Sequence, residues 1–107
     1  MQKGNVFDAI PASLPKEISQ GLLAAEGVCI ERIVSAGQAS PEGFWYDQEE
    51  HEWVLLLKGS AGLEIQGEES VRELAVGDYL FLPAHQRHRV VWTDACEETI
   101  WLAVFFS

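Results

Sequence analysis

Short apolar or alternating segments, separated by glycine, proline and acidic residues, run through most of the chain. The segment 52–58 reads Glu-Trp-Val-Leu-Leu-Leu-Lys and ends at Gly59. An apolar run of this length bounded by glycine is typical of a buried strand, so we expect both of its faces to be covered. The segment 63–66, Leu-Glu-Ile-Gln, alternates apolar and polar residues and completes a predicted hairpin.

The same patterns predict strands along most of the remaining chain. The predicted strands are 28–34, 44–46, 52–58, 63–66, 71–75, 79–82, 87–93 and 99–106. Short strands at even spacing, with turn residues between them, predict an all-β sandwich or barrel. Near the beginning, Ser13 and Pro15 resemble the first turn of a helix that ends before Gly21. We therefore expect an N-terminal arm with a short helix over residues 1–26 and a barrel over residues 27–107.

Composition narrows the classes of partner. The chain has 107 residues and a formal net charge of -10, so it is repelled by nucleic acid and by anionic membrane surfaces. No apolar run approaches the roughly 20 residues of a membrane span, and the first residues do not resemble a signal peptide. Cys29 and Cys96 lie among apolar neighbours in predicted strands. They indicate buried free thiols in a cytoplasmic protein rather than a disulfide.

Several polar residues lie at the ends of the predicted strands. Glu52 opens the buried strand, and a charge in that position needs an ion pair, hydrogen bonds or a metal. His85 and His88 follow Pro83 where two strands join, and Asp47 follows an aromatic segment. Because strand ends meet at the mouth of a barrel, we expect these side chains to lie close together.

The spacing of these residues resembles two motifs of the cupin family. The first motif places six residues between a glutamate and a glycine, as in Glu52 and Gly59. The second places five residues between a glycine and a proline, followed by a ligand histidine, as in Gly77, Pro83 and His88. The resemblance covers nearly the whole predicted barrel and implies a double-stranded β-helix, the cupin jelly-roll barrel.

The sequence departs from the family pattern at the histidine pair of the first motif. With a four-residue gap before Glu52, the two histidine places fall on Trp45 and Asp47. With a three-residue gap they fall on Tyr46 and Gln48. Neither choice supplies a histidine, so the usual set of three histidines and one glutamate is incomplete.

The resemblance still implies a divalent metal, which would be iron, manganese, nickel or zinc. Its predicted ligands are Asp47, Glu52 and His88, with Gln48, His85 and His51 as weaker candidates. Two carboxylates and an imidazole resemble the facial ligand sets that leave metal positions open for substrate. His85 occupies the place of a glycine in the second motif. The alternative is a hydrogen-bonded polar cluster without a metal.

Aromatic side chains are candidates for a ligand pocket. These are Trp45, Tyr46, Trp92 and Trp101, which would otherwise belong to the core or to a dimer interface. The resulting hypothesis is a metal-binding barrel that acts on or binds a small organic molecule, as a dioxygenase, isomerase or lyase. The alternatives are a metal-free ligand-binding protein or a structural homodimer in which an edge strand, 28–34 or 99–106, pairs between subunits.

Overall fold

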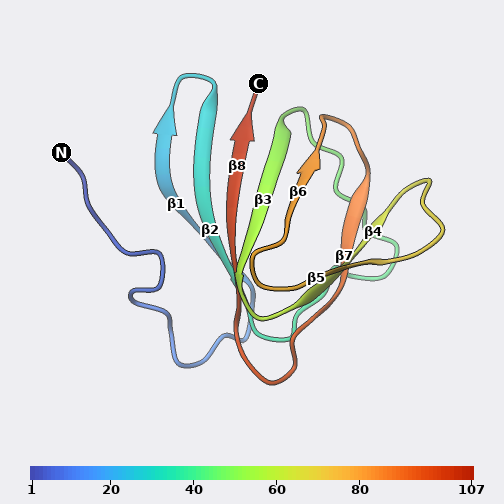
Figure 1. Cartoon of the computed structure of the whole chain (residues 1–107), viewed down its shortest axis with the longest axis horizontal. Coiled ribbons are helices and arrows are strands. Elements are labelled where there is room, and N and C mark those ends of the chain that lie inside the picture. Colours follow the sequence, from blue (N-terminus) through green and yellow to red (C-terminus); the bar gives the residue numbers. More distant parts are fainter.

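A computed structural model describes all residues from 1 to 107 and contains strands and no helix (Figure 1). The strands are β1 (Ile18–Ala25), β2 (Val28–Ser35), β3 (His51–Lys58), β4 (Ala61–Ile65), β5 (Arg72–Leu74), β6 (Tyr79–Leu82), β7 (His88–Thr93) and β8 (Thr99–Phe106). They form a five-stranded sheet in the order β1-β2-β8-β3-β6 and a three-stranded sheet in the order β5-β4-β7. All the pairings are antiparallel, which confirms the predicted all-β double-stranded β-helix. No helical segment has the length and hydropathy needed to cross a bilayer.

The predicted N-terminal helix is wrong. Residues 18–25 form β1, which pairs with β2 from Ile18 opposite Val34 to Ala25 opposite Val28, with a bulge near Gly21. Backbone pairing with β2 overrides the capping pattern in the preceding residues, because tertiary context outweighs local helix propensity. Figure 1 shows β1 at the outer edge of the larger sheet, with the irregular N-terminal segment beyond it.

Two strands expected to form a subunit contact are interior strands. β2 lies between β1 and β8, and β8 lies between β2 and β3 (Figure 1). Their backbone groups already pair on both sides, so neither can add to a sheet of another subunit. The homodimer stays a prediction, and it would have to use a different surface.

Two smaller expectations are also corrected. The segment 44–46 is not a strand and contributes only an isolated bridge between Tyr46 and His88. Cys96 is free but exposed, in a turn where the Asp94 carboxylate accepts the backbone N–H of Cys96 at 2.8 Å. Cys29 is free and partly buried in β2.

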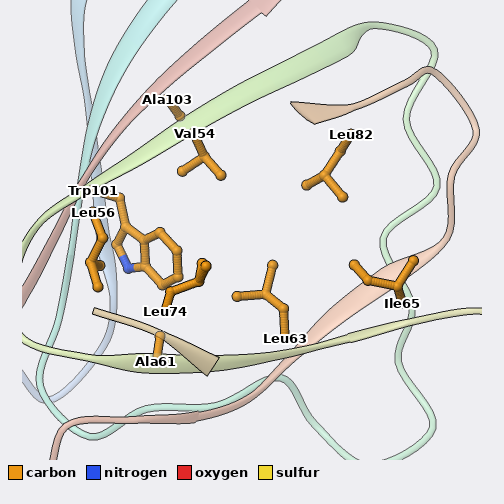
Figure 2. Close-up of a cluster of buried hydrophobic side chains, with 9 residues drawn as sticks. All are labelled: Val54, Leu56, Ala61, Leu63, Ile65, Leu74, Leu82, Trp101 and Ala103. Carbon is orange, nitrogen blue, oxygen red and sulfur yellow. The ribbon is translucent and has the colours of Figure 1, made fainter. Parts of the chain in front are cut away.

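The hydrophobic core lies between the two sheets. Figure 2 shows Val54 and Trp101 of the larger sheet pointing toward Leu63 and Ile65 of β4. On β3, even-numbered residues from Glu52 to Leu56 are buried, whereas odd-numbered ones remain partly exposed. The expectation that both faces of this strand are covered is therefore wrong, since the second sheet covers only one.

The turn after β3 requires a glycine. Gly59 has a φ of 83°, in the left-handed region. A Cβ atom there would lie 2.8 Å from the carbonyl oxygen of Glu98 and 2.5 Å from Oγ1 of Thr99. Glycine alone meets both demands at no steric cost, which explains the spacing of the first motif.

Candidate functional site

A cavity of about 390 Å³ lies between the two sheets, within the size range of small-ligand pockets. Its polar lining includes four carboxylates and an imidazole, from Glu17, Glu31, Glu50, Glu52 and His88, together with Ser19, Cys29, Ser35, Tyr46 and Gln48. Its apolar lining is Ile33, Val54, Leu63, Leu82, Val90, Trp101 and Phe105. Several of these apolar residues belong to the core of Figure 2, so the core forms part of the cavity wall.

Alternation along β2 and β3 places two of the four acidic residues in the cavity. Cys29, Glu31 and Ile33 are two residues apart on β2 and line the cavity together. Glu52 lines it from β3, on the other side of β8. Ala103 of β8 pairs with Glu31 and carries only a methyl group, so it adds little bulk between the two carboxylates.

The Glu52 carboxyl group is nearly enclosed. Its side chain is 9% exposed. Burial is the largest of the causes that raise its pKa from 4.5 to about 7; the charges of Glu31 and Glu17 act in the same direction, and a hydrogen bond from the Gln48 amide acts against them. Near neutral pH this group is therefore present in both its protonated and its ionised form, so it can donate a proton or accept one.

His88 presents a defined nitrogen to Glu52. Its Nδ1 lies 2.9 Å from the carbonyl oxygen of Gln86, which can only accept, so Nδ1 carries the hydrogen. Burial lowers the pKa of His88, and its Nε2 then holds a free lone pair 3.7 Å from Oε1 of Glu52. The Tyr46 ring stacks on the imidazole, with ring centres 5.3 Å apart, and helps to fix its orientation.

Asp47 does not join Glu52 and His88. Its Oδ1 lies 2.8 Å from Nδ1 of His85, and both side chains are exposed outside the cavity. The segment that contains Asp47 is irregular, so strand alternation does not decide its direction, and the neighbouring Gln48 faces the cavity instead. His85 has a φ of 64°, which explains why the family motif has a glycine in this place.

His51 also lies away from the cavity. Its Nδ1 accepts the backbone N–H of Ala84 at 2.9 Å. Its ring packs against the rings of Phe81 and Phe106, with ring centres 5.7 and 5.3 Å away. This histidine therefore has a structural role on the outer face of the larger sheet.

The four predicted pocket aromatics divide into two pairs. Tyr46 and Trp101 line the cavity. Trp45 packs outside under the Arg87 guanidinium, 5.6 Å from its ring centre. Trp92 is 37% exposed, and its ring packs over Gly62. Gly62 pairs with Trp92 and Leu63 with Val90, so the residue between Val90 and Trp92 has no partner on β4. This extra residue turns the Trp92 side chain to the face opposite to that of Val90.

The residues present do not fit a metal site with three protein ligands. No group of three or more histidine, cysteine, aspartate or glutamate side chains is arranged to hold a metal ion. Glu52 and His88 form a pair, whereas Asp47 and His85 pair with each other elsewhere. Open zinc and iron(II) sites use three protein ligands, so the predicted set of Asp47, Glu52 and His88 is not assembled.

Three lining carboxylates were missed in the sequence. Glu31 carries a usable signal, because it lies between Cys29 and Ile33 on the same face of a strand. Glu17 and Glu50 carry none, since each precedes a strand in an irregular segment.

The comparisons with known proteins agree on the fold. The family model described as Cupin domain matches residues 32–105. A crystal structure from Ralstonia eutropha JMP134, described as a "putative mannose-6-phosphate isomerase", is 51% identical with a TM-score of 0.97, covering 100% of this chain and 99% of that one.

More distant structures share the fold alone. A cupin superfamily protein from Desulfitobacterium hafniense DCB-2 is 20% identical with a TM-score of 0.73, covering 91% of this chain and 83% of its own. An RmlC-like cupin protein from Desulfovibrio desulfuricans is 18% identical with a TM-score of 0.74, covering 98% and 96%. Among curated proteins, none matches this sequence.

Proposed function

The chain belongs to the cupin family, and on that premise we propose that it binds a small organic molecule in the cavity and transfers a proton on it, as isomerases and lyases do. One observation carries this proposal. A buried carboxyl group with a pKa of about 7 lies 3.7 Å from the free nitrogen of a neutral imidazole, inside a cavity of ligand size. A pKa near the working pH is what general acid–base catalysis needs.

The two groups have different roles in the proposed reaction. Ionised Glu52 accepts a proton from a carbon or hydroxyl of the bound molecule, and its protonated form returns one to the neighbouring atom. Nε2 of His88 accepts a hydrogen bond from a ligand hydroxyl and holds it against the carboxyl group, because Nδ1 is already committed to Gln86. The 3.7 Å separation is longer than a hydrogen bond, so a ligand atom can bind beside both groups.

The similar protein from Ralstonia eutropha supports this class of reaction. The isomerase in its description interconverts two sugar forms, which requires a proton to move between neighbouring carbons. A single carboxyl group that gains and loses a proton near neutral pH is chemically sufficient for such a transfer.

The proposed reaction does not depend on a metal, because Glu52 and His88 supply only two of the three expected ligands. Elemental analysis of protein purified without chelator tests this point. We expect iron, manganese, nickel and zinc each well below one per chain. One metal per chain that is lost in a His88→Ala variant would contradict the metal-free assignment.

Deuterium exchange measures the proposed proton transfer directly. The protein is incubated in D₂O with aldoses, ketoses, amino sugars and mannose 6-phosphate, and exchange next to the carbonyl carbon is followed by NMR. We expect wild-type protein to catalyse exchange on at least one compound and Glu52→Gln to lose about 100-fold or more of that rate. Asp47→Asn, which changes an exposed carboxylate outside the cavity, is the matched control and should keep the rate.

Two outcomes would contradict the proposal. Equal exchange by Glu52→Gln and wild-type protein would remove Glu52 from the proton transfer. Binding of a compound without any exchange would favour the alternative function, a metal-free ligand-binding cupin.

A further inference from the structure

We propose that the cavity selects small organic cations, such as amines and quaternary ammonium compounds, over neutral and anionic molecules. This inference rests on the proposed use of the cavity as a ligand site. It names the class of molecule that the charges, the aromatic rings and the volume of the cavity favour.

The fixed charges of the cavity wall have one sign. Four carboxylates line it, and no lysine or arginine does. The nearest arginine along β2 is Arg32, which points to the other side of the sheet and donates to the carbonyl oxygens of Val6 at 3.0 Å and Asp8 at 2.5 Å. Arg89 donates outside the barrel to the carbonyl oxygens of Phe44 and Ser40. No side chain with a permanent positive charge therefore reaches a ligand in the cavity.

A buried acceptor in this wall lacks a positively charged partner. The Glu52 side chain is 91% buried and lines the cavity, where the Gln48 amide donates to it and the nearest basic group is the neutral imidazole of His88, with Nε2 at 3.7 Å. A buried carboxylate without a countercharge is costly, and the negative charges of Glu31 and Glu17 add to this cost. A ligand cation beside Glu52 would supply the missing positive charge.

The other titratable groups that face Glu52 do not supply that charge. They are Glu17, Cys29, Glu31, Tyr46, Glu50 and His88. Carboxyl, thiol and phenol groups are neutral when protonated and negative when deprotonated, so none of them carries a positive charge. His88 alone can carry one, and burial favours its neutral form. The excess negative charge of the cavity therefore remains for a ligand to neutralise.

The remaining walls also suit a cation. The rings of Tyr46, Trp101 and Phe105 line the same cavity. The faces of aromatic rings attract organic cations, and this attraction is strongest where water is excluded. A volume of about 390 Å³ accommodates a small molecule of this type.

The same charges argue against a phosphorylated sugar. A phosphate dianion in the cavity would meet four carboxylates and no lysine or arginine. Phosphate sites in proteins use arginine, lysine or helix N-termini, and this all-β chain places none of them at the cavity. We therefore infer that this chain takes a different substrate from the mannose 6-phosphate in the description of its 51% identical relative.

Calorimetric titration at about pH 8, above the pKa of about 7 of Glu52, tests this selection. The central pair is choline and 3,3-dimethyl-1-butanol, which have nearly the same shape and differ in charge. We expect choline to bind about tenfold or more tightly than the neutral alcohol, and mannose 6-phosphate not to bind at about 10 mM. A titration with 1,4-diaminobutane extends the test to primary amines.

A pair of variants assigns the effect to the cavity. Glu31→Gln should weaken choline binding by about three- to tenfold and leave the binding of 3,3-dimethyl-1-butanol unchanged, since it removes one charge and no volume. Glu73→Gln, on the exposed side of β5, should change neither. Thermal unfolding of each variant verifies that the fold is retained.

The outcomes separate this inference from the proposed reaction. Tighter binding of choline without proton exchange on any compound would support the selection of cations and contradict the reaction. Equal binding of choline and its neutral analogue, binding of mannose 6-phosphate, or failure of both choline and 1,4-diaminobutane to bind would overturn the selection, whatever the exchange experiment gives.

Discussion

The two faces of the five-stranded sheet are built by the same strands and carry opposite chemistry. The inner face presents Glu31 and Glu52 to a cavity. On the outer face, Trp53 of β3 pairs with Val104 on one side and with Phe81 on the other. Phe81 is 50% exposed and packs beside the rings of His51 and Phe106.

An antiparallel sheet with one solvent face usually buries its apolar residues and exposes its polar ones. Here part of that pattern is inverted, because carboxylates lie inside and aromatic rings lie outside. Buried charges and exposed apolar patches each indicate binding rather than folding. The comparison suggests that the inner face serves a small ligand and that the outer face is where the predicted homodimer would form.

The largest effect on stability is expected on the inner face, from the pKa of Glu52. This pKa is about 7 in the folded protein and 4.5 as its ordinary value, so the folded state holds the proton more tightly. Stability is then lost as the pH rises from 4.5 through 7, by about 3 kcal/mol for this group alone. Urea unfolding of wild-type protein and Glu52→Gln at about pH 4 and pH 8 measures the difference, and the variant should gain about 3 kcal/mol relative to wild type at the higher pH.

Comparison with Glu52→Gln is needed because other groups also titrate in this range. The pKa of Glu17 is raised by burial and adds to the same slope, whereas the lowered pKa of His88 makes stability rise with pH near 6.5. If the free energy of unfolding changed with pH by the same amount in both proteins, the pKa of Glu52 would not be raised in the folded state.

The next effect is expected on the outer face, as a change in association. Phe81→Glu places a charge on this apolar surface and should weaken the predicted homodimer by about 2 kcal/mol, or about thirtyfold. Val76→Glu is the matched control, because Val76 is 63% exposed in the turn between β5 and β6. Sedimentation velocity over a range of concentrations measures both, and a wild-type protein that remains monomeric throughout would contradict the homodimer.

The smallest effect is expected at the exposed pair of Asp47 and His85, which belongs to neither face. Asp47→Asn should change the free energy of unfolding by about 0.5 kcal/mol or less, because solvent screens exposed ion pairs. Choline binding should not change. Thermal unfolding and titration verify both expectations, and a loss of choline affinity as large as that of Glu31→Gln would show that Asp47 acts on the cavity.

Much of the fold was predictable because alternation and glycine spacing report on local geometry. The predicted strands 28–34, 52–58 and 99–106 coincide with β2, β3 and β8 to within one residue. β1 was missed because all but one of its side chains are exposed, so its residues carry little hydrophobic pattern. Its strand conformation comes from pairing with β2, which lies outside any local window of sequence.

The site was predictable in part for the same reason. Glu52 and His88 lie in regular strands, and both line the cavity. Asp47 lies in an irregular segment, where neighbouring residues do not follow a fixed period. Its direction depends on the hydrogen bond that His85 offers from a distant part of the chain, and spacing alone does not contain that information.

The lining of the cavity is divided between the sheets. All four carboxylates come from the five-stranded sheet or from residues that immediately precede its strands, whereas the three-stranded sheet supplies His88, Leu63 and Val90. The five-stranded sheet also supplies most of the apolar lining, so a mutation there can change either the charge or the shape of the cavity. The three-stranded sheet supplies no carboxylate, so a substitution of Leu63 or Val90 can reshape the cavity and leave all four negative groups in place.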